Sequence, residues 1–208
     1  MISAADALAR LREGNRRFVA NQLGTGASTP ERRVALLAGQ EPFAIVLGCS
    51  DSRVPAELVF DQGFGDLFVI RVAGNVVAPS QVGSVEFAAS RYGTPLVVVM
   101  GHSQCGAVSA TLEELLGGET AQSRNLRSIV DRVRPPLETL LSGRDVADPA
   151  ALMAEAVRAN VRASVDHLRH GSELLEELIR KDGLLVVGAE YSLESGIVTF
   201  FEGASPTS

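Results

Sequence analysis

The run Leu96-Val-Val-Val-Met-Gly101 is apolar from end to end, without the alternation of apolar and polar residues that marks a strand with one face in water. Ala44-Ile-Val-Leu-Gly48 has the same character, and residues 67–72 and 184–188 are similar runs rich in Val, Ile and Leu. Unbroken apolar runs of this length are typical of strands buried on both faces of a parallel sheet. The sequence therefore predicts an α/β fold with a central, mostly parallel sheet.

Helices are expected around these strands. Apolar residues at helical spacing, with capping residues and glycine stops, predict helices over residues 3–12, 83–92, 105–116, 124–141, 149–169 and 173–181, the fourth of them interrupted at Pro135-Pro136. Near the end of the chain, residues 191–201 predict a hairpin whose second strand is 197–201. Residues 14–30 predict an arm with little core of its own.

Composition favours a globular enzyme. At 208 residues the chain can bury one sizeable core, so we expect a single domain over 1–208, with a helical arm over 1–35 and a disordered tail over 203–208. The 19 basic and 25 acidic residues include no cluster of Lys and Arg, so we expect no nucleic-acid partner. The first 20 residues are amphipathic and interrupted by charges, unlike a signal peptide or a membrane span. We therefore expect a cytoplasmic protein without membrane contact.

Two polar strings follow two of the expected strands directly. The first is Cys49-Ser-Asp51-Ser-Arg53, and the second is His102-Ser-Gln-Cys105. Parallel α/β sheets assemble their sites at the carboxyl ends of strands, so these strings are expected to meet. In extended chain Cys49, Asp51 and Arg53 share one face, and His102 and Cys105 share one face of a helical first turn. Sulfur and nitrogen ligands of this kind predict a Zn²⁺ site.

Other interpretations of the two cysteines are a disulfide, a pair of inert core thiols, or a structural zinc site. A disulfide is disfavoured because the chain has only these two Cys and no secretory signature. Inert thiols would not require Asp, Arg and His at matching offsets. Structural zinc sites usually have four permanent ligands, whereas here Arg53 stands beside the carboxylate of Asp51 and can draw it off the metal. The pattern therefore favours a catalytic metal.

The chain resembles the β-class carbonic anhydrases. The resemblance is carried, in the expected order, by Gly48-Cys-Ser-Asp-Ser-Arg-Val54, Gly65-Asp-Leu-Phe-Val-Ile-Arg71, Gly83-Ser-Val-Glu-Phe87 and Gly101-His-Ser-Gln-Cys-Gly106. It implies a sheet of four parallel strands with an antiparallel edge strand, and a homodimer that can pair into tetramers. It also implies reversible hydration of CO₂ to bicarbonate and a proton, by attack of a zinc-bound hydroxide.

The resemblance assigns roles residue by residue. Cys49, His102 and Cys105 match the protein ligands of one Zn²⁺ per subunit, and Asp51 matches either the fourth ligand or the partner of Arg53. The remaining matches concern the substrate: Gln40 is expected to orient it, while Phe68, Phe87 and Gly106 are expected to line its pocket. Some of these side chains can come from the neighbouring subunit. Without the resemblance, Gln40 would be interpreted as a solvated amide and the two Phe as core.

Two departures from the family pattern have consequences. Residues 71–75 read Arg-Val-Ala-Gly-Asn where the family commonly has Arg-Asn-x-Ala-Asn, which alters the expected shape of the pocket. One branch of the family binds bicarbonate through a Trp, an Arg and a Tyr and so holds Asp on zinc. Arg71 and Tyr191 match two of those positions, but the Trp position is Val46. We therefore predict that Asp51 pairs with Arg53 and leaves the fourth zinc position to water.

Two alternatives of a different class stay open at this point. The same zinc site in a related enzyme would hydrolyse carbonyl sulfide or carbon disulfide. In a non-catalytic zinc protein, Asp51 would instead remain on the metal permanently and CO₂ would not be hydrated.

Overall fold

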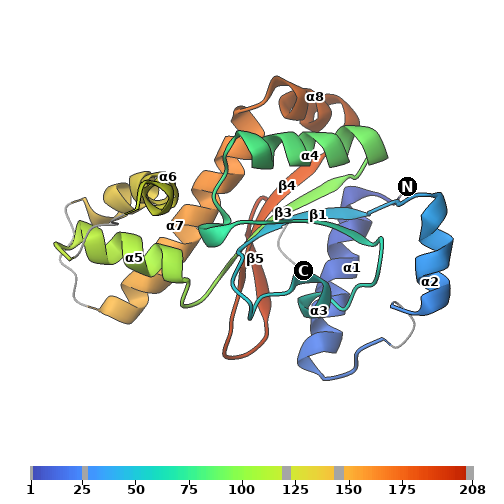
Figure 1. Ribbon diagram of the computed structural model, residues 1–208, viewed down its shortest axis with the longest axis horizontal. Coiled ribbons are helices and arrows are strands. Elements are labelled where there is room, and N and C mark those ends of the chain that lie inside the picture. Colours follow the sequence, from blue (N-terminus) through green and yellow to red (C-terminus); the bar gives the residue numbers. More distant parts are fainter. Residues whose placement is uncertain (1, 25–27, 119–122, 143–147, 205–208) are drawn as a thin grey trace.

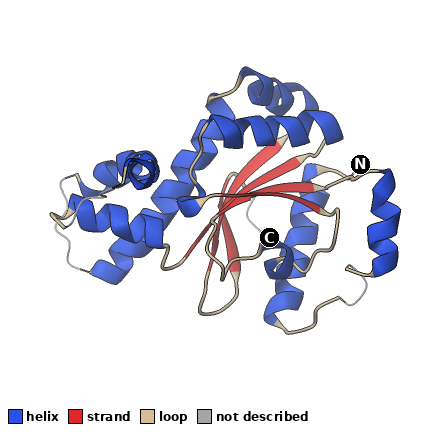
Figure 2. Ribbon diagram, viewed as in Figure 1, coloured by secondary structure: helices blue, strands red, loops and turns tan. Residues whose placement is uncertain are grey.

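The computed structural model describes residues 2–24, 28–118, 123–142 and 148–204. At its centre is a five-stranded sheet in the order β2-β1-β3-β4-β5. The strands are β1 (Ala44–Gly48), β2 (Leu67–Arg71), β3 (Leu96–His102), β4 (Leu185–Tyr191) and β5 (Val198–Glu202). The first four are parallel, whereas β5 pairs with β4 in antiparallel fashion. Helices surround the sheet (Figure 2), so the predicted fold class is confirmed.

Helices cover both faces of the sheet (Figure 1), and each face has its own core of buried side chains. On one face α1 (Ala4–Val19) and α3 (Ala56–Val59) pack against residues such as Val46 and Val98. The other face is covered by α4 (Pro79–Tyr92), α7 (Pro149–His170) and α8 (Glu173–Asp182), which pack against residues such as Leu47 and Val99. Successive side chains of a strand point to opposite faces. Because both faces are buried at the centre of the sheet, β1 and residues 96–101 of β3 carry no polar side chain, which explains the unbroken apolar runs in the sequence.

A third core lies beyond the carboxyl end of β3, where α5 (Gly106–Leu115) and α6 (Arg124–Leu141) pack beside α7. It contains both cysteines of the chain, Cys49 and Cys105. Contrary to the predicted interruption, α6 continues through Pro135 and Pro136. A proline lacks the N–H of the helical ladder, but the apolar face of α6 stays packed through Val133 and Leu137 on either side.

The first helix is longer than the sequence predicts. It was expected to end near Arg12, but α1 continues to Val19. Gly14 weakens the local helical signal, yet the fold requires it, because an added Cβ would lie 1.8 Å from the carbonyl oxygen of Phe60. The next residue, Asn15, is buried and donates to the carbonyl oxygens of Val59 and Gly196 at 3.1 and 2.9 Å. The expectation of little core from residue 14 onward is therefore wrong for 14–19.

The remainder of the arm is different. The short helices α2 (Pro30–Ala35) and η1 (Leu36–Ala38) contribute no buried residue. Leu37 is 86% exposed and Val34 is 66% exposed, which leaves apolar side chains of this segment in contact with solvent in a single chain. Such surfaces on a soluble chain commonly mark an interaction site.

Three boundaries also differ from the prediction. Helix α4 begins at Pro79 rather than residue 83, since Pro is well suited to the first helical turn. Strand β4 continues to Tyr191 rather than residue 188, because β3 pairs with it as far as His102. At the carboxyl end, Ala204 packs against the first core, whereas residues 205–208 of the predicted tail lie outside the described residues. Within the described parts of the chain, no helix has the length and apolar character needed to cross a membrane.

Candidate metal centre

Strands β1 and β3 are neighbours in the sheet, and Gly48 of β1 pairs with Met100 of β3. Both strands run in the same direction, so the string that follows β1 meets the string that ends β3 at one edge. Cys49, His102 and Cys105 are all buried there, and their ligand atoms lie within 4.8 Å of one another. The structure therefore brings together the three side chains that the sequence singled out as metal ligands.

His102 is held in one orientation by its surroundings. Its side chain is fully buried, and Nδ1 lies 2.9 Å from the carbonyl oxygen of Ser103. Ser103 is itself fixed, because its Oγ accepts a hydrogen bond from the backbone N–H of Leu193 at 2.9 Å. With Nδ1 donating to a carbonyl, Nε2 is the basic nitrogen, and none of the described residues offers it a hydrogen-bond partner. A buried nitrogen without a partner, facing two thiols, fits a metal ion better than an apolar core.

The two thiols are electrostatically unequal. The contact with Cys105 lowers the pKa of the Cys49 thiol, while the same contact and burial raise the pKa of Cys105. Cys49 also accepts a hydrogen bond from the backbone N–H of Gly74, with a nitrogen-to-sulfur distance of 3.4 Å. These contacts favour a thiolate at Cys49. Since the thiolate is the form that binds metals, this donor set fits Zn²⁺.

Asp51 lies beside the three ligands but pairs with Arg53. Its Oδ2 is 4.0 Å from Nε2 of His102, while Arg53 contacts both carboxylate oxygens at 2.7 and 2.9 Å. The hydrogen bond from Arg53 holds the pKa of Asp51 well below its usual range. The carboxylate therefore stays charged, and it is engaged by the guanidinium rather than turned fully toward the ligand cluster.

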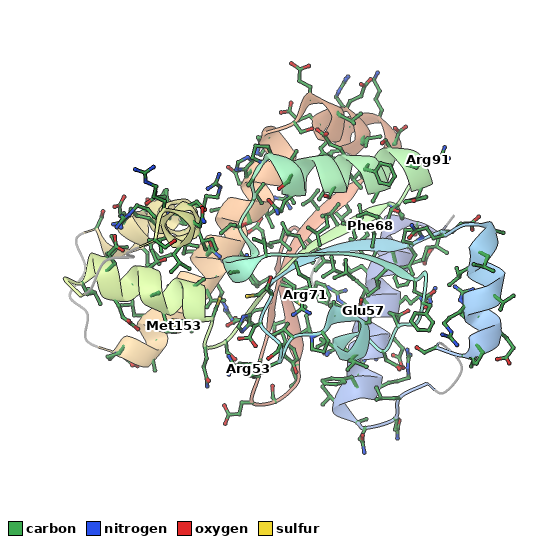
Figure 3. The ribbon with its side chains drawn as sticks, viewed as in Figure 1. Arg53, Glu57, Phe68, Arg71, Arg91 and Met153 are labelled. Atoms are coloured by element: carbon green, nitrogen blue, oxygen red, sulfur yellow. The ribbon has the colours of Figure 1, made fainter. Side chains whose placement is uncertain are left out.

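A second arginine shapes the loop after β1. Arg71, at the end of the neighbouring strand β2, donates through Nε to the carbonyl oxygen of Cys49 at 2.9 Å and through Nη2 to that of Asp51 at 2.5 Å. Figure 3 shows Arg71 and Arg53 at the same end of the sheet. Arg71 had been matched to a bicarbonate pocket, but in this chain its guanidinium fixes the loop that carries Cys49 and Asp51.

The predicted substrate residues lie elsewhere within the single chain. Phe68 pairs with Ile45, four residues before Cys49 on the adjoining strand, which corresponds to roughly 13 Å along the sheet. Phe68 and Phe87 form an aromatic cluster with Tyr92, with ring centroids 5.7 to 6.3 Å apart. Gln40 precedes the amino end of β1 and donates to the Tyr92 hydroxyl at 3.0 Å. One chain thus does not bring these side chains to the cysteines.

Gly106 is the predicted pocket residue that does lie beside the ligand cluster. It is the first residue of α5, directly after Cys105. A Cβ built at Gly106 would meet no atom within 4 Å, so there is open space at this point. Gln104, two residues before Gly106, has a φ of 57°, a left-handed conformation that turns the chain from His102 into α5.

Sequence reasoning missed one contributor to the site, the turn η2 (Ala73–Asn75), whose Gly74 donates to Cys49. The pair Gly74-Asn75 is a recognisable turn signal. An added Cβ at Gly74 would lie 3.0 Å from the Cβ of Ala107, which explains the small side chains that depart from the family pattern here. No local signal connects this turn to a cysteine 25 residues earlier.

Comparison with known proteins agrees with this geometry. A family model described as carbonic anhydrase matches residues 44–198. Carbonic anhydrase 2 of Mycobacterium tuberculosis is 40% identical over 186 residues, covering 89% of this chain and 87% of the relative. A carbonic anhydrase of Mycolicibacterium smegmatis is 41% identical over 188 residues, covering 90% of this chain and 88% of the relative.

Solved structures give the same result. The β-carbonic anhydrase CafA of Aspergillus fumigatus superposes with a TM-score of 0.75 at 26% identity, covering 97% of this chain and 91% of that one. One of two tetrameric β-carbonic anhydrases of Sordaria macrospora has the same fold, with a TM-score of 0.75 at 24% identity over 83% of this chain and 87% of that one. With the family model matching most of the chain and close relatives covering nearly all of it, this protein belongs to the β class of the carbonic anhydrase family.

Proposed function

We propose that this chain catalyses the reversible hydration of CO₂ to bicarbonate and a proton, with one Zn²⁺ per subunit held by Cys49, His102 and Cys105. The observation that carries the proposal is the buried, unpartnered Nε2 of His102 in a cluster with two thiols. A bound Zn²⁺ supplies Lewis acidity that lowers the pKa of a coordinated water and so provides a nucleophile near neutral pH. The work of the protein is to hold that ion and to orient the reactants around it.

Asp51 and Arg53 provide the orientation. Because Arg53 engages both oxygens of Asp51, the carboxylate is kept from acting as a fourth metal ligand, and that position is left to solvent. Oδ2 of Asp51 lies 4.0 Å from His102 Nε2, close enough for the carboxylate to accept a hydrogen bond from a nucleophile bound at the cluster. A nucleophile held this way keeps one lone pair free for attack on CO₂.

We further propose that the working unit is a homodimer or a larger assembly, in which Gln40, Phe68 and Phe87 complete the site of the partner subunit. Support comes from their separation from Cys49 within one chain, and from the exposure of Phe87, 51% of which faces solvent. The arm helix α2 has no buried residue and carries the exposed Val34, which suits a contact with a second copy. We place the protein in the cytoplasm, because a reducing compartment keeps both thiols available to the metal.

The decisive test is a stopped-flow assay of CO₂ hydration with a pH indicator, run on protein whose zinc content has been measured. Rapid hydration at one zinc per subunit is the expected result. Zinc-loaded protein that does not hydrate CO₂ would contradict the proposal and favour a non-catalytic zinc protein. Adding carbonyl sulfide or carbon disulfide and measuring sulfide release tests the remaining enzyme class. If either compound were turned over faster than CO₂, that compound and not CO₂ would be the substrate.

A further inference from the structure

The backbone N–H of Gly74 donates to the sulfur of Cys49, and the backbone of Asp51 also favours the thiolate there. Gly74 adopts a φ of 68° and Asn75 a φ of 45°, so the turn η2 is left-handed at two consecutive positions. Glycine restricts its own backbone less than any other residue. The direction of this N–H therefore depends on what holds the turn, which is its own bond from the Asn75 N–H to the Val72 carbonyl oxygen at 3.0 Å together with contacts from outside.

Helix α7 holds it. Nδ2 of Asn160 donates to the carbonyl oxygen of Gly74 at 2.8 Å, and Oγ of Ser164 donates to that of Asn75 at 3.1 Å. Both side chains are buried, with 2% of Asn160 and 5% of Ser164 exposed. The two bonds differ in what they fix. Asn160 bonds to the carbonyl oxygen of Gly74, the residue whose own N–H donates to the sulfur. Ser164 bonds to the carbonyl oxygen of the next residue, Asn75.

Hydrogen bonds of this kind tune a metal ligand. Outer partners that fix a ligand and adjust its electron donation typically change metal affinity or activity 10- to 100-fold when removed. An N–H that points at a thiolate withdraws electron density from the sulfur, and a charged acceptor makes the bond stronger than one between neutral groups. Loss of the bond should therefore make Cys49 a stronger electron donor and a less well-fixed ligand.

We propose that Asn160 is a positioning residue for the thiolate of Cys49, acting through Gly74. Asn160 fixes the Gly74 carbonyl and with it the peptide plane between Gly74 and Asn75, which anchors the residue whose N–H, in the preceding peptide plane, points at the sulfur. Asn160 lies 111 positions from Cys49 in sequence and touches no ligand itself. The proposal rests on the proposed function only in that Cys49 is taken as a metal ligand.

The test uses the purified full-length protein loaded with Co²⁺, whose thiolate-to-metal charge-transfer absorption reports the donor strength of sulfur. Asn160→Leu, which has a similar shape and no donor, should shift this band to lower energy and lower Co²⁺ affinity about tenfold in competition with a chelator. Ser164→Ala is the matched control, because it removes a buried hydrogen bond from the same helix to the same turn. It should lower the urea midpoint while leaving the band in place.

An unchanged band in Asn160→Leu, or an equal shift in Ser164→Ala, would overturn the proposal. Asn160→Ala covers the case in which Asn160→Leu does not fold. Asn160 lines a cavity of about 750 Å³ between α4, α6 and α7, so truncation leaves room for water to pair with the Gly74 carbonyl. The wild-type protein separates this inference from the proposed function: if it gives no thiolate charge-transfer band with Co²⁺, the metal assignment itself fails.

Discussion

Arg53 engages both carboxylate oxygens of Asp51, with Nε donating to Oδ1 at 2.9 Å and Nη2 donating to Oδ2 at 2.7 Å. The backbone N–H of Arg53 donates to Oδ1 as well, also at 2.9 Å. Two residues apart in sequence, they form a bidentate pair at the edge of the ligand cluster. This pairing sets the state of the proposed site, because a carboxylate held by Arg53 is withheld from the metal.

Removing the guanidinium of Arg53 should therefore allow the carboxylate of Asp51 to bind the metal and exclude water from it. We expect Arg53→Ala to retain its zinc but to lose about tenfold or more in turnover, because Asp51 would lose its charge partner and could bind the metal in place of water. Turnover by stopped-flow and zinc content by metal analysis check this. Arg16→Ala serves as control, because Arg16 is exposed and pairs with Glu13 on the surface of α1. Wild-type turnover in Arg53→Ala would exclude the gating role.

The thiols should be indispensable. Cys49→Ala and Cys105→Ala should each abolish CO₂ hydration and lower zinc content, because the chain contains only these two cysteines and a thiolate is a strong zinc ligand. Ser50→Ala is the matched control, since Ser50 adjoins Cys49 but is exposed. If either cysteine variant kept full zinc and full activity, the metal would have to lie elsewhere.

The pH dependence follows from the lowered pKa of Asp51. Arg53 holds this pKa below the usual value of about 3.9, so the carboxylate stays charged and paired at any pH used for assay. Activity between pH 6 and pH 9 should rise along a single-proton curve, measured by stopped-flow in matched buffers. A steeply cooperative curve would instead indicate a switch in which Asp51 moves onto the metal.

The lowered pKa of Asp51 also makes the stability of the protein depend on pH. A carboxyl whose pKa is lower in the folded state stabilises the fold above its unfolded value, and this contribution is lost as the pH falls through the folded value. Asp51→Asn should therefore lose stability relative to wild type near neutral pH, and the difference should narrow at strongly acidic pH. Urea unfolding of metal-free protein at several pH values measures it.

Mixed dimers can show whether the site is shared. If Gln40 serves the partner subunit, a heterodimer of one Cys49→Ala chain and one Gln40→Ala chain has one of its two sites intact, although each parent dimer has none. We expect such heterodimers, purified through two different tags, to regain activity that both parents lack. Inactive heterodimers that assemble normally and retain zinc would mean that Gln40 serves its own chain, whereas an active Gln40→Ala parent would mean that Gln40 does not serve the reaction.

Alanine substitutions at two glycines should change the stability of the protein in opposite directions. Gly101 precedes His102 on β3, and a Cβ there would lie 2.6 Å from Cγ2 of Val161, so Gly101→Ala should cost about 1–3 kcal/mol of stability by overpacking. In contrast, a Cβ at Gly83, inside α4, meets no atom within 4 Å. Gly83→Ala should stabilise the protein by up to about 1 kcal/mol through helix propensity. Urea midpoints of the two variants check both signs.

The sequence alone determined the sheet and the ligand cluster. Apolar runs such as Leu96–Val-Val-Val-Met100 can be buried only from both sides, and the polar residues that follow them had to emerge at the carboxyl edge of parallel strands. Cys49, Asp51, Arg53, His102 and Cys105 were accordingly predicted to meet. The structure places the three side chains proposed as metal ligands together, with the Asp51–Arg53 pair beside them.

Only the tertiary structure decided the contacts that hold this cluster in place. Gly14 of α1 lies so close to the carbonyl of Phe60 that a side chain there would clash, and the carbonyl of Gly74 accepts a hydrogen bond from Asn160, 86 residues later in the chain. Local patterns record the propensity of a segment and the face it buries. They do not record which distant backbone atom will approach it, because that approach exists only once the sheet and its covering helices have packed.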